Sequence, residues 1–207
     1  MNVYTRRPKN KLKLMKKMIP KICILVSQNF QKEVKAINEL ERFEAVTFVT
    51  YPARCGCPHI QADELAALIG TPNDYSRIHI IGGCCLAKLE ESSVTNGQLH
   101  KLEQCFSAIT SKTLIDSYLQ QGAYLITPGW LANWQLQIAR WGFEQQAARD
   151  FFREFCTKLV LLDTGVDANS AQYLREVADF VERSYEIVPV GLDFFILFLS
   201  KIILEDQ

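Results

Sequence analysis

Short apolar runs alternate with segments of helical periodicity along almost the whole of this chain. The first run, KICILVS at residues 21–27, is nearly continuous in its apolar character, which is typical of a strand buried on both faces. Residues 30–42 follow with apolar side chains three or four positions apart, and residues 45–51 are rich in β-branched and aromatic residues. This strand, helix, strand order predicts parallel strands, because the helix carries the chain back to the edge of the sheet where it began.

The same alternation continues to the end of the chain. Further strands are predicted at residues 77–83, 104–109, 123–128, 158–164 and 185–190. Further helices are predicted at residues 63–69, 112–120, 130–141, 144–155 and 192–204, with one more after a cap at Asp167 or Asn169. We therefore expect an α/β fold of the Rossmann-like kind, with a mainly parallel sheet of six or seven strands and helices on both faces.

One folded domain is expected over residues 21–207, after a basic arm at residues 1–20. The lysines and arginines of that arm are typical of a flexible, solvated terminus, and contact with an anionic membrane or nucleic acid is the less favoured alternative. The alternative is a domain divided into two lobes near residues 110–122.

The balance of charge argues against a general nucleic-acid binder. Lysine plus arginine and aspartate plus glutamate each total 23, so the chain lacks a strong basic field. No apolar run approaches the ~20 residues needed to cross a bilayer, and the basic start is a poor secretory signal. We expect a cytoplasmic protein, in which the 7 cysteines are free thiols or metal ligands rather than disulfides.

Four cysteines lie where predicted strands end. Cys55 and Cys57 follow the second strand, whereas Cys84 and Cys85 follow the third. The carboxyl ends of parallel strands form the ligand-binding edge of an open α/β sheet, so these thiols predict a binding site. Gly83 would let a ligand approach the backbone closely, although tight packing of small residues explains the turn equally well.

A metal site is one interpretation of these thiols. Cys55, Cys57 and His59 form a C-x-C-x-H pattern, and Cys85 and Cys105 could add donors for zinc or another transition metal. The favoured alternative is a loop of thiols without metal. The adjoining Arg54 could lower the pKa of Cys55 by favouring its thiolate, which would make Cys55 a redox or covalent candidate.

The second half of the chain offers further candidates at strand ends. In TPGW, Thr127 can cap a helix whose free N–H groups would bind an anion or a carbonyl group, and Gly129 would permit close approach. Trp130 is placed at the same edge, although an aromatic core position is the favoured role for it. At the next strand end, Asp163 could bind a hydroxyl group or a cation, or cap a helix, with Thr164 beside it.

The positions of the histidines do not indicate a particular catalytic reaction. His79 lies within a predicted strand and is expected to be buried and hydrogen-bonded, whereas His100 is expected on a surface helix. No local motif supports a Ser, His and Asp triad, so the sequence predicts a site without naming a catalytic residue.

The order of these motifs resembles a known family. YPARCGCP, IIGGCC, GAYLITPGWL, KLVLLDTGVD and EIVPVGLDFF, over roughly residues 20–200, resemble the domain of unknown function 1638, and TPGW and LLDTG are the most specific pieces. The resemblance implies single-domain proteins of bacteria and archaea, and similar domains that precede sensor histidine kinases. It implies no established activity.

The resemblance also implies a set of donor positions from which this chain departs. Members commonly carry a cysteine after the first strand, a cysteine in the glycine-rich turn after the third, and a His-x-Cys pair near the middle. Here the first position is Ser27, the turn holds Cys84 and Cys85, and the middle pair reads Glu103 and Cys105. These exchanges would weaken a soft-metal or corrinoid-type site.

Two classes of function follow from the sequence. The first is a small-molecule-binding or sensory domain whose cysteine-rich cleft is lined by Cys55, Gly83, Cys85, Cys105, Thr127, Gly129, Trp130, Asp163 and Thr164, with a signalling partner such as a histidine kinase. The alternative is a metal- or thiol-dependent enzyme of methyl-transfer or redox type. The apolar last helix could form a homodimer contact, but its burial in the core is the favoured expectation.

Overall fold

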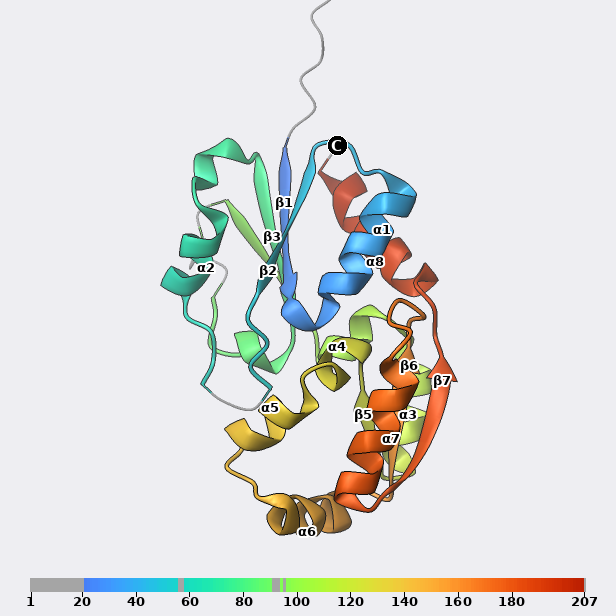
Figure 1. Ribbon diagram of the computed structural model, residues 1–207. Coiled ribbons are helices and arrows are strands. Elements are labelled where there is room, and N and C mark those ends of the chain that lie inside the picture. Colours follow the sequence, from blue (N-terminus) through green and yellow to red (C-terminus); the bar gives the residue numbers. More distant parts are fainter. Residues whose placement is uncertain (1–20, 56–57, 91–93, 95, 207) are drawn as a thin grey trace, which may run out of the picture.

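The computed structural model describes residues 21–55, 58–90, 94 and 96–206 (Figure 1). It confirms an α/β fold built on parallel strands, and its seven strands are divided between two sheets with the orders β2-β1-β3-β4 and β5-β6-β7. The strands are β1 (Ile22–Ser27), β2 (Val46–Tyr51), β3 (Arg77–Gly82), β4 (Gly97–Lys101), β5 (Ala123–Ile126), β6 (Lys158–Asp163) and β7 (Ser184–Pro189).

Helices follow most strands, as the periodicity predicted. They are α1 (Gln31–Glu41), α2 (Ala62–Ile69), α3 (Lys112–Gln120), α4 (Pro128–Leu131), α5 (Trp134–Arg140), α6 (Gln145–Phe155), α7 (Ser170–Val181) and α8 (Asp193–Glu205). Short 3₁₀ turns η1 (Gln28–Phe30), η2 (Pro72–Asp74), η3 (Cys84–Leu86) and η5 (Cys105–Ala108) fill several loops.

The four-stranded sheet is covered on both faces, which explains the apolar run that forms β1. Every residue of β1 is buried. Ile22 and Ile24 pack toward the core of α1 and α8, whereas Cys23 and Leu25 pack toward α2. Helix α8 reaches this sheet from the far end of the chain and lies beside α1 (Figure 1).

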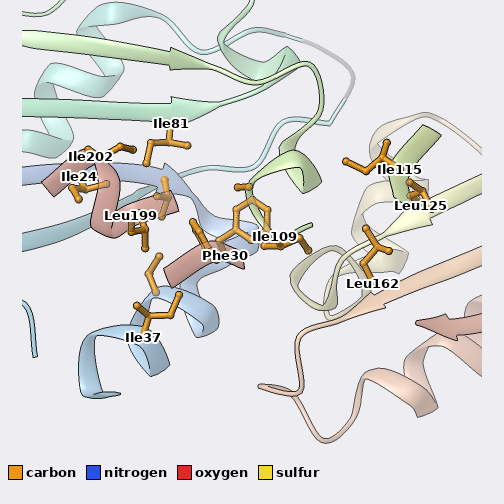
Figure 2. Packing of buried hydrophobic residues seen from close by; sticks show 14 of the residues in the cluster. Ile24, Phe30, Ile37, Ile81, Ile109, Ile115, Leu125, Leu162, Leu199 and Ile202 are labelled. Carbon is orange, nitrogen blue, oxygen red and sulfur yellow. The ribbon is translucent and has the colours of Figure 1, made fainter. Parts of the chain in front are cut away.

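The three-stranded sheet repeats this arrangement around β6. Leu159 and Leu161 pack against α6 and α7, whereas Val160 and Leu162 belong to the core that continues into the first sheet. Figure 2 shows this continuous core, in which Ile109 lies between residues of the first sheet and Leu162 of the second. The chain passes from one sheet to the other between Lys101 and Ala123, so both sheets share one core although they share no strand.

The carboxyl ends of the two sheets face each other. In Figure 1 the strands of the first sheet run down toward the middle of the molecule, and those of the second run up toward it. The turn η1 after β1 consequently contacts α4 after β5. Loops at the strand ends of both sheets therefore meet along one interface.

One strand was predicted in the wrong place. Residues 104–109 form the turn η5 and its C-cap, and the fourth strand is β4, which the sequence did not reveal. Strand β4 lies at the edge of its sheet and its residues are half-buried or exposed, so GQLHK carries no apolar run. In η5, by contrast, Ala108 and Ile109 are buried because the turn itself inserts into the shared core.

The last helix is part of the core, as favoured from the sequence. Phe195, Leu199, Ile202 and Ile203 of α8 are buried against the first sheet. Within the part of the chain that the structure describes, no helix has both the length and the apolar character to cross a membrane.

Candidate functional site

A cavity of about 400 Å³ lies where the two sheets meet, and we call it the inter-sheet cavity. It is lined by Asn29, Cys55, Cys84, Gln104, Cys105, Phe106, Leu119, Ala123, Tyr124, Leu125, Ile126, Thr127, Trp130, Trp141 and Phe155. These described residues include no aspartate, glutamate, lysine, arginine or histidine. The cavity is therefore largely apolar and aromatic, with a few uncharged polar groups.

One wall of the cavity is the open edge of β5. Ala123 to Thr127 line it as five consecutive residues, whereas a sheet face would contribute every second residue. Strand β5 is the edge strand of its sheet and pairs with β6 on its other side. The edge thus offers backbone N–H and C=O groups to whatever occupies the cavity.

Three cysteines line the cavity, and two of them, Cys55 and Cys84, were expected at strand ends. Cys55, Cys84 and Cys105 line the cavity, and the fully buried Cys85 lies behind them. We call these four residues the thiol cluster. Cys105 packs against the buried side chains around Cys85, and hydrogen bonding among Cys84, Cys85 and Cys105 raises the pKa of Cys85 and lowers that of Cys105. The structure thus places Cys55, after β2, and Cys84, after β3, at the lining of the same cavity.

The thiols of the cluster differ in pKa. Hydrogen bonds from Cys85 and from the backbone N–H of Gly83 hold the pKa of Cys105 below its usual value, although burial acts in the opposite direction. Burial raises the pKa of Cys55 to about 11. The suggestion that Arg54 lowers the pKa of Cys55 was wrong, because the guanidinium of Arg54 pairs with Glu64 instead.

Cys55 is also fixed from the other side of the cavity. The indole Nε1 of Trp141 donates a 3.0 Å hydrogen bond to the carbonyl oxygen of Cys55, and Asn29 Nδ2 lies 3.7 Å from its sulfur. Trp141 follows α5, whereas Asn29 belongs to η1. The loop after β2 is thereby tied to elements of both sheets.

The TPGW motif contributes to the same cavity. Thr127 caps α4 by accepting a 3.4 Å hydrogen bond from the backbone N–H of Trp130, and both residues line the cavity. Helix α4 is only 4 residues long, so the helix dipole predicted to attract an anion is weak. A Cβ atom on Gly129 would lie 2.0 Å from the backbone oxygen of Asn29, so the chain itself occupies the space predicted for a ligand.

Two residues that were predicted to bind a ligand, Asp163 and Thr164, make hydrogen bonds within the protein instead. Asp163 accepts a 2.9 Å hydrogen bond from the backbone of Gly165 and so stabilises its own loop. Thr164 donates a 2.9 Å hydrogen bond to the buried carboxylate of Glu33 on α1. Asp163 ends β6 and holds its own loop, whereas Thr164 follows β6 and joins the two sheets. Neither residue lines the cavity.

Three of the predicted metal donors, Cys55, Cys85 and Cys105, belong to the thiol cluster. His59 Nδ1 lies 3.0 Å from the carbonyl oxygen of Cys84, and Cys57 lies outside the described residues. Among the residues that the structure does describe, no three His, Cys, Asp or Glu side chains are arranged to hold a metal ion. A zinc or other transition-metal site that includes Cys57 stays a prediction.

The histidines of the first sheet form a separate network. His79 is buried within β3, as expected, and its Nδ1 lies 2.9 Å from Nε2 of His100. Its Nε2 is hydrogen-bonded to Asp206, directly after α8. His100 was wrongly expected on a helix, because it belongs to the edge strand β4 whose mixed sequence hides its structure.

Several cavity residues were missed from the sequence. Asn29 could have been found, because it follows β1 at the same edge as the thiols. Leu119 and Phe155 carried no such signal, since they lie at the far ends of α3 and α6. They reach the cavity because α3 and α6 pack against side chains on opposite faces of β5.

Comparison with known proteins assigns the chain to a protein family. A family model described as "Protein of unknown function (DUF1638)" matches residues 61–199, which is more than half of the chain's 207 residues. No curated protein and no solved structure matches the chain. The matched region extends from α2 into α8 and so includes most of the lining of the inter-sheet cavity. The chain belongs to the DUF1638 family of proteins of unknown function.

Proposed function

We propose that this protein binds a neutral, largely apolar small molecule in the inter-sheet cavity and acts as a ligand-binding or sensory domain. The observation that carries the proposal is the cavity itself, which gathers aromatic walls, thiols and an open strand edge from distant parts of the chain. Its volume of about 400 Å³ falls within the ~300–1,000 Å³ common for ligand pockets.

The chemistry of the lining indicates the class of ligand. Tyr124, Trp130 and Trp141 supply apolar surface, and the ring centroids of Tyr124 and Trp130 are 6.0 Å apart. The lining carries no charged side chain among the described residues, which disfavours phosphates and carboxylates as the principal binding group. Carbonyl, amide or hydroxyl groups on the ligand would pair with the edge of β5.

Ligand binding would fix the two sheets relative to each other, because elements of both sheets line the cavity. A signalling partner such as a histidine kinase could detect this change.

The proposal is tested with the neutral fluorescent probe 1-aminoanthracene. We expect saturable binding with one probe per chain, energy transfer from tryptophan and a raised melting temperature, because a ligand that binds only the folded state stabilises it. Leu119→Trp adds bulk to the cavity wall and should reduce affinity at least tenfold. Leu136→Trp is the matched control, since Leu136 is similarly exposed on α5 but does not line the cavity.

The outcomes separate a cavity ligand from surface adsorption. Loss of binding in Leu119→Trp with full binding in Leu136→Trp supports the proposal. Non-saturable fluorescence, or equal affinity in both variants, overturns it, because the probe would then bind away from the cavity.

A further inference from the structure

The thiol cluster contains a pair of cysteines with different access to solvent. Cys105 lines the inter-sheet cavity and is partly buried, whereas Cys85 is 0% exposed. Cys105 packs against the cluster of buried side chains that contains Cys85, and hydrogen bonding with Cys85 lowers the pKa of Cys105. A small reagent that enters the cavity can therefore meet the sulfur of Cys105, and Cys85 lies directly behind it.

The surroundings of Cys105 favour its thiolate. Its sulfur accepts hydrogen bonds from the Cys85 thiol and from the backbone N–H of Gly83, and these donors lower its pKa. A Cβ atom on Gly83 would lie 3.3 Å from that sulfur and 3.1 Å from the backbone nitrogen of Cys105. Glycine at position 83 thus lets the turn after β3 approach Cys105 closely.

The other cysteines that the structure describes lack this combination. Burial raises the pKa of Cys55 and of Cys23 to about 11, and Cys23 is 0% exposed on β1. Cys156 is buried at the end of α6, where its thiol donates to the carbonyl oxygen of Phe152 at 3.4 Å. Cys84 is exposed rather than partly buried.

We propose that Cys105 and Cys85 form a peroxide-sensitive thiol–disulfide pair, with Cys105 as the attacked thiol and Cys85 as the resolving thiol. The inference goes beyond ligand binding, because it requires no ligand in the cavity. Hydrogen peroxide, or an organic peroxide small enough to enter, is the oxidant.

The chemistry has two balanced steps. The Cys105 thiolate attacks one peroxide oxygen, the O–O bond breaks, and Cys105 sulfenic acid forms while hydroxide leaves. The sulfur of Cys85 then attacks the sulfenic sulfur, the S–O bond breaks, and the departing oxygen takes the Cys85 proton and leaves as water. The two thiols lose two electrons in total, and the peroxide gains them. A dithiol such as dithiothreitol reverses the reaction by disulfide exchange.

The disulfide would alter the cavity wall. It would connect η3, directly after the glycine turn of β3, to η5, which inserts into the shared core. The sulfur of Cys105 would turn away from the cavity and toward the buried Cys85. The oxidised and reduced proteins would therefore present different walls to a ligand.

Peptide mapping of the full chain tests the pair directly. Reduced protein is treated with a few equivalents of hydrogen peroxide, remaining thiols are alkylated, and the protein is digested with trypsin. Cleavage after lysine and arginine places Cys85 in the peptide 78–88 and Cys105 in the peptide 102–112. We expect these peptides to become disulfide-linked, and dithiothreitol to release them.

Variants identify the two partners, because Cys84 shares a peptide with Cys85. Cys85→Ser should abolish the linked species and leave a sulfenic acid on Cys105 that dimedone labels. Cys84→Ser should still form the link, and Cys156→Ser, which removes a distant thiol outside the cavity, should form it at an unchanged rate. Melting curves of each variant verify folding, and if a variant fails to fold, fragment spectra of the linked wild-type peptides locate the bonded sulfur at Cys84 or Cys85.

Three results would overturn the proposal. The first is a wild-type map in which Cys105 stays reduced while other thiols are oxidised. The second is a link that persists in Cys85→Ser, which would assign the partner to Cys84. The third is oxidation of Cys105 no faster than that of Cys156 in the same digest.

Discussion

Thr164 Oγ1 donates a 2.9 Å hydrogen bond to Oε1 of Glu33, and this bond joins the end of β6 to helix α1 across the two sheets. Glu33 is 0% exposed, and its other carboxylate oxygen has no hydrogen-bond partner among the described residues. Burial raises the pKa of Glu33, with smaller opposing contributions from hydrogen bonds. The contact between the sheets thus contains a carboxyl group that is costly to ionise.

The raised pKa predicts how Glu33→Gln depends on pH. A carboxyl whose pKa is higher in the folded protein than in the unfolded chain favours folding less as pH rises from its unfolded value through its folded value. Glutamine cannot ionise and keeps an oxygen for Thr164. The melting temperature of Glu33→Gln minus that of wild type should therefore become more positive from pH 4 to pH 7. A difference that is constant with pH, or that falls, would contradict this assignment.

Gly129→Ala should separate the two sheets. The added methyl group would lie 2.0 Å from the backbone oxygen of Asn29, which cannot move without displacing η1. We expect destabilisation above ~3 kcal/mol by denaturant unfolding, larger than an ordinary surface change. Gly142→Ala is the comparison, because that position has φ of +75° but open space around it, and should cost only ~1–2 kcal/mol. Equal losses in both variants would show that the close approach is unimportant.

Asp206→Ala should destabilise the first sheet. The change removes the acceptor of buried His79, which leaves a ring nitrogen unpaired at a cost of ~1–3 kcal/mol. The neighbouring Glu205→Ala serves as control, because Glu205 is exposed and its contact with Lys201 is 3.9 Å long. Chemical unfolding of both variants should show a loss for Asp206→Ala alone.

Cys105 should react with iodoacetamide at a lower pH than an ordinary thiol. Alkylation follows the thiolate fraction, and the lowered pKa of Cys105 places the midpoint of its rate profile below the usual value of 9.0. Cys85→Ala removes a donor and should move that midpoint upward. Quantitative mapping of the peptide 102–112 between pH 5 and pH 10 provides the measurement. A wild-type midpoint at or above 9, or no change in the variant, would count against the hydrogen-bond assignment.

Strong local patterns account for most of the elements that were predicted correctly. The apolar run of β1 and the periodicity of α1 were readable because each element buries a continuous set of side chains. Strand β4 was missed because an edge strand is half exposed and needs no apolar run. The turn η5 was mistaken for a strand because its apolar residues are buried by the other sheet, which local sequence cannot show.

The sequence by itself determined that the strands are parallel and that Cys55, Cys84 and Cys85 follow strands, because periodicity and chain order follow from local side-chain chemistry. Only the tertiary structure decided that seven strands form two sheets whose carboxyl edges face each other. That arrangement places Cys105 and Thr127 in one cavity and directs Thr164 to Glu33 instead. Such choices depend on contacts between residues far apart in the chain, and no local pattern encodes which distant surfaces meet.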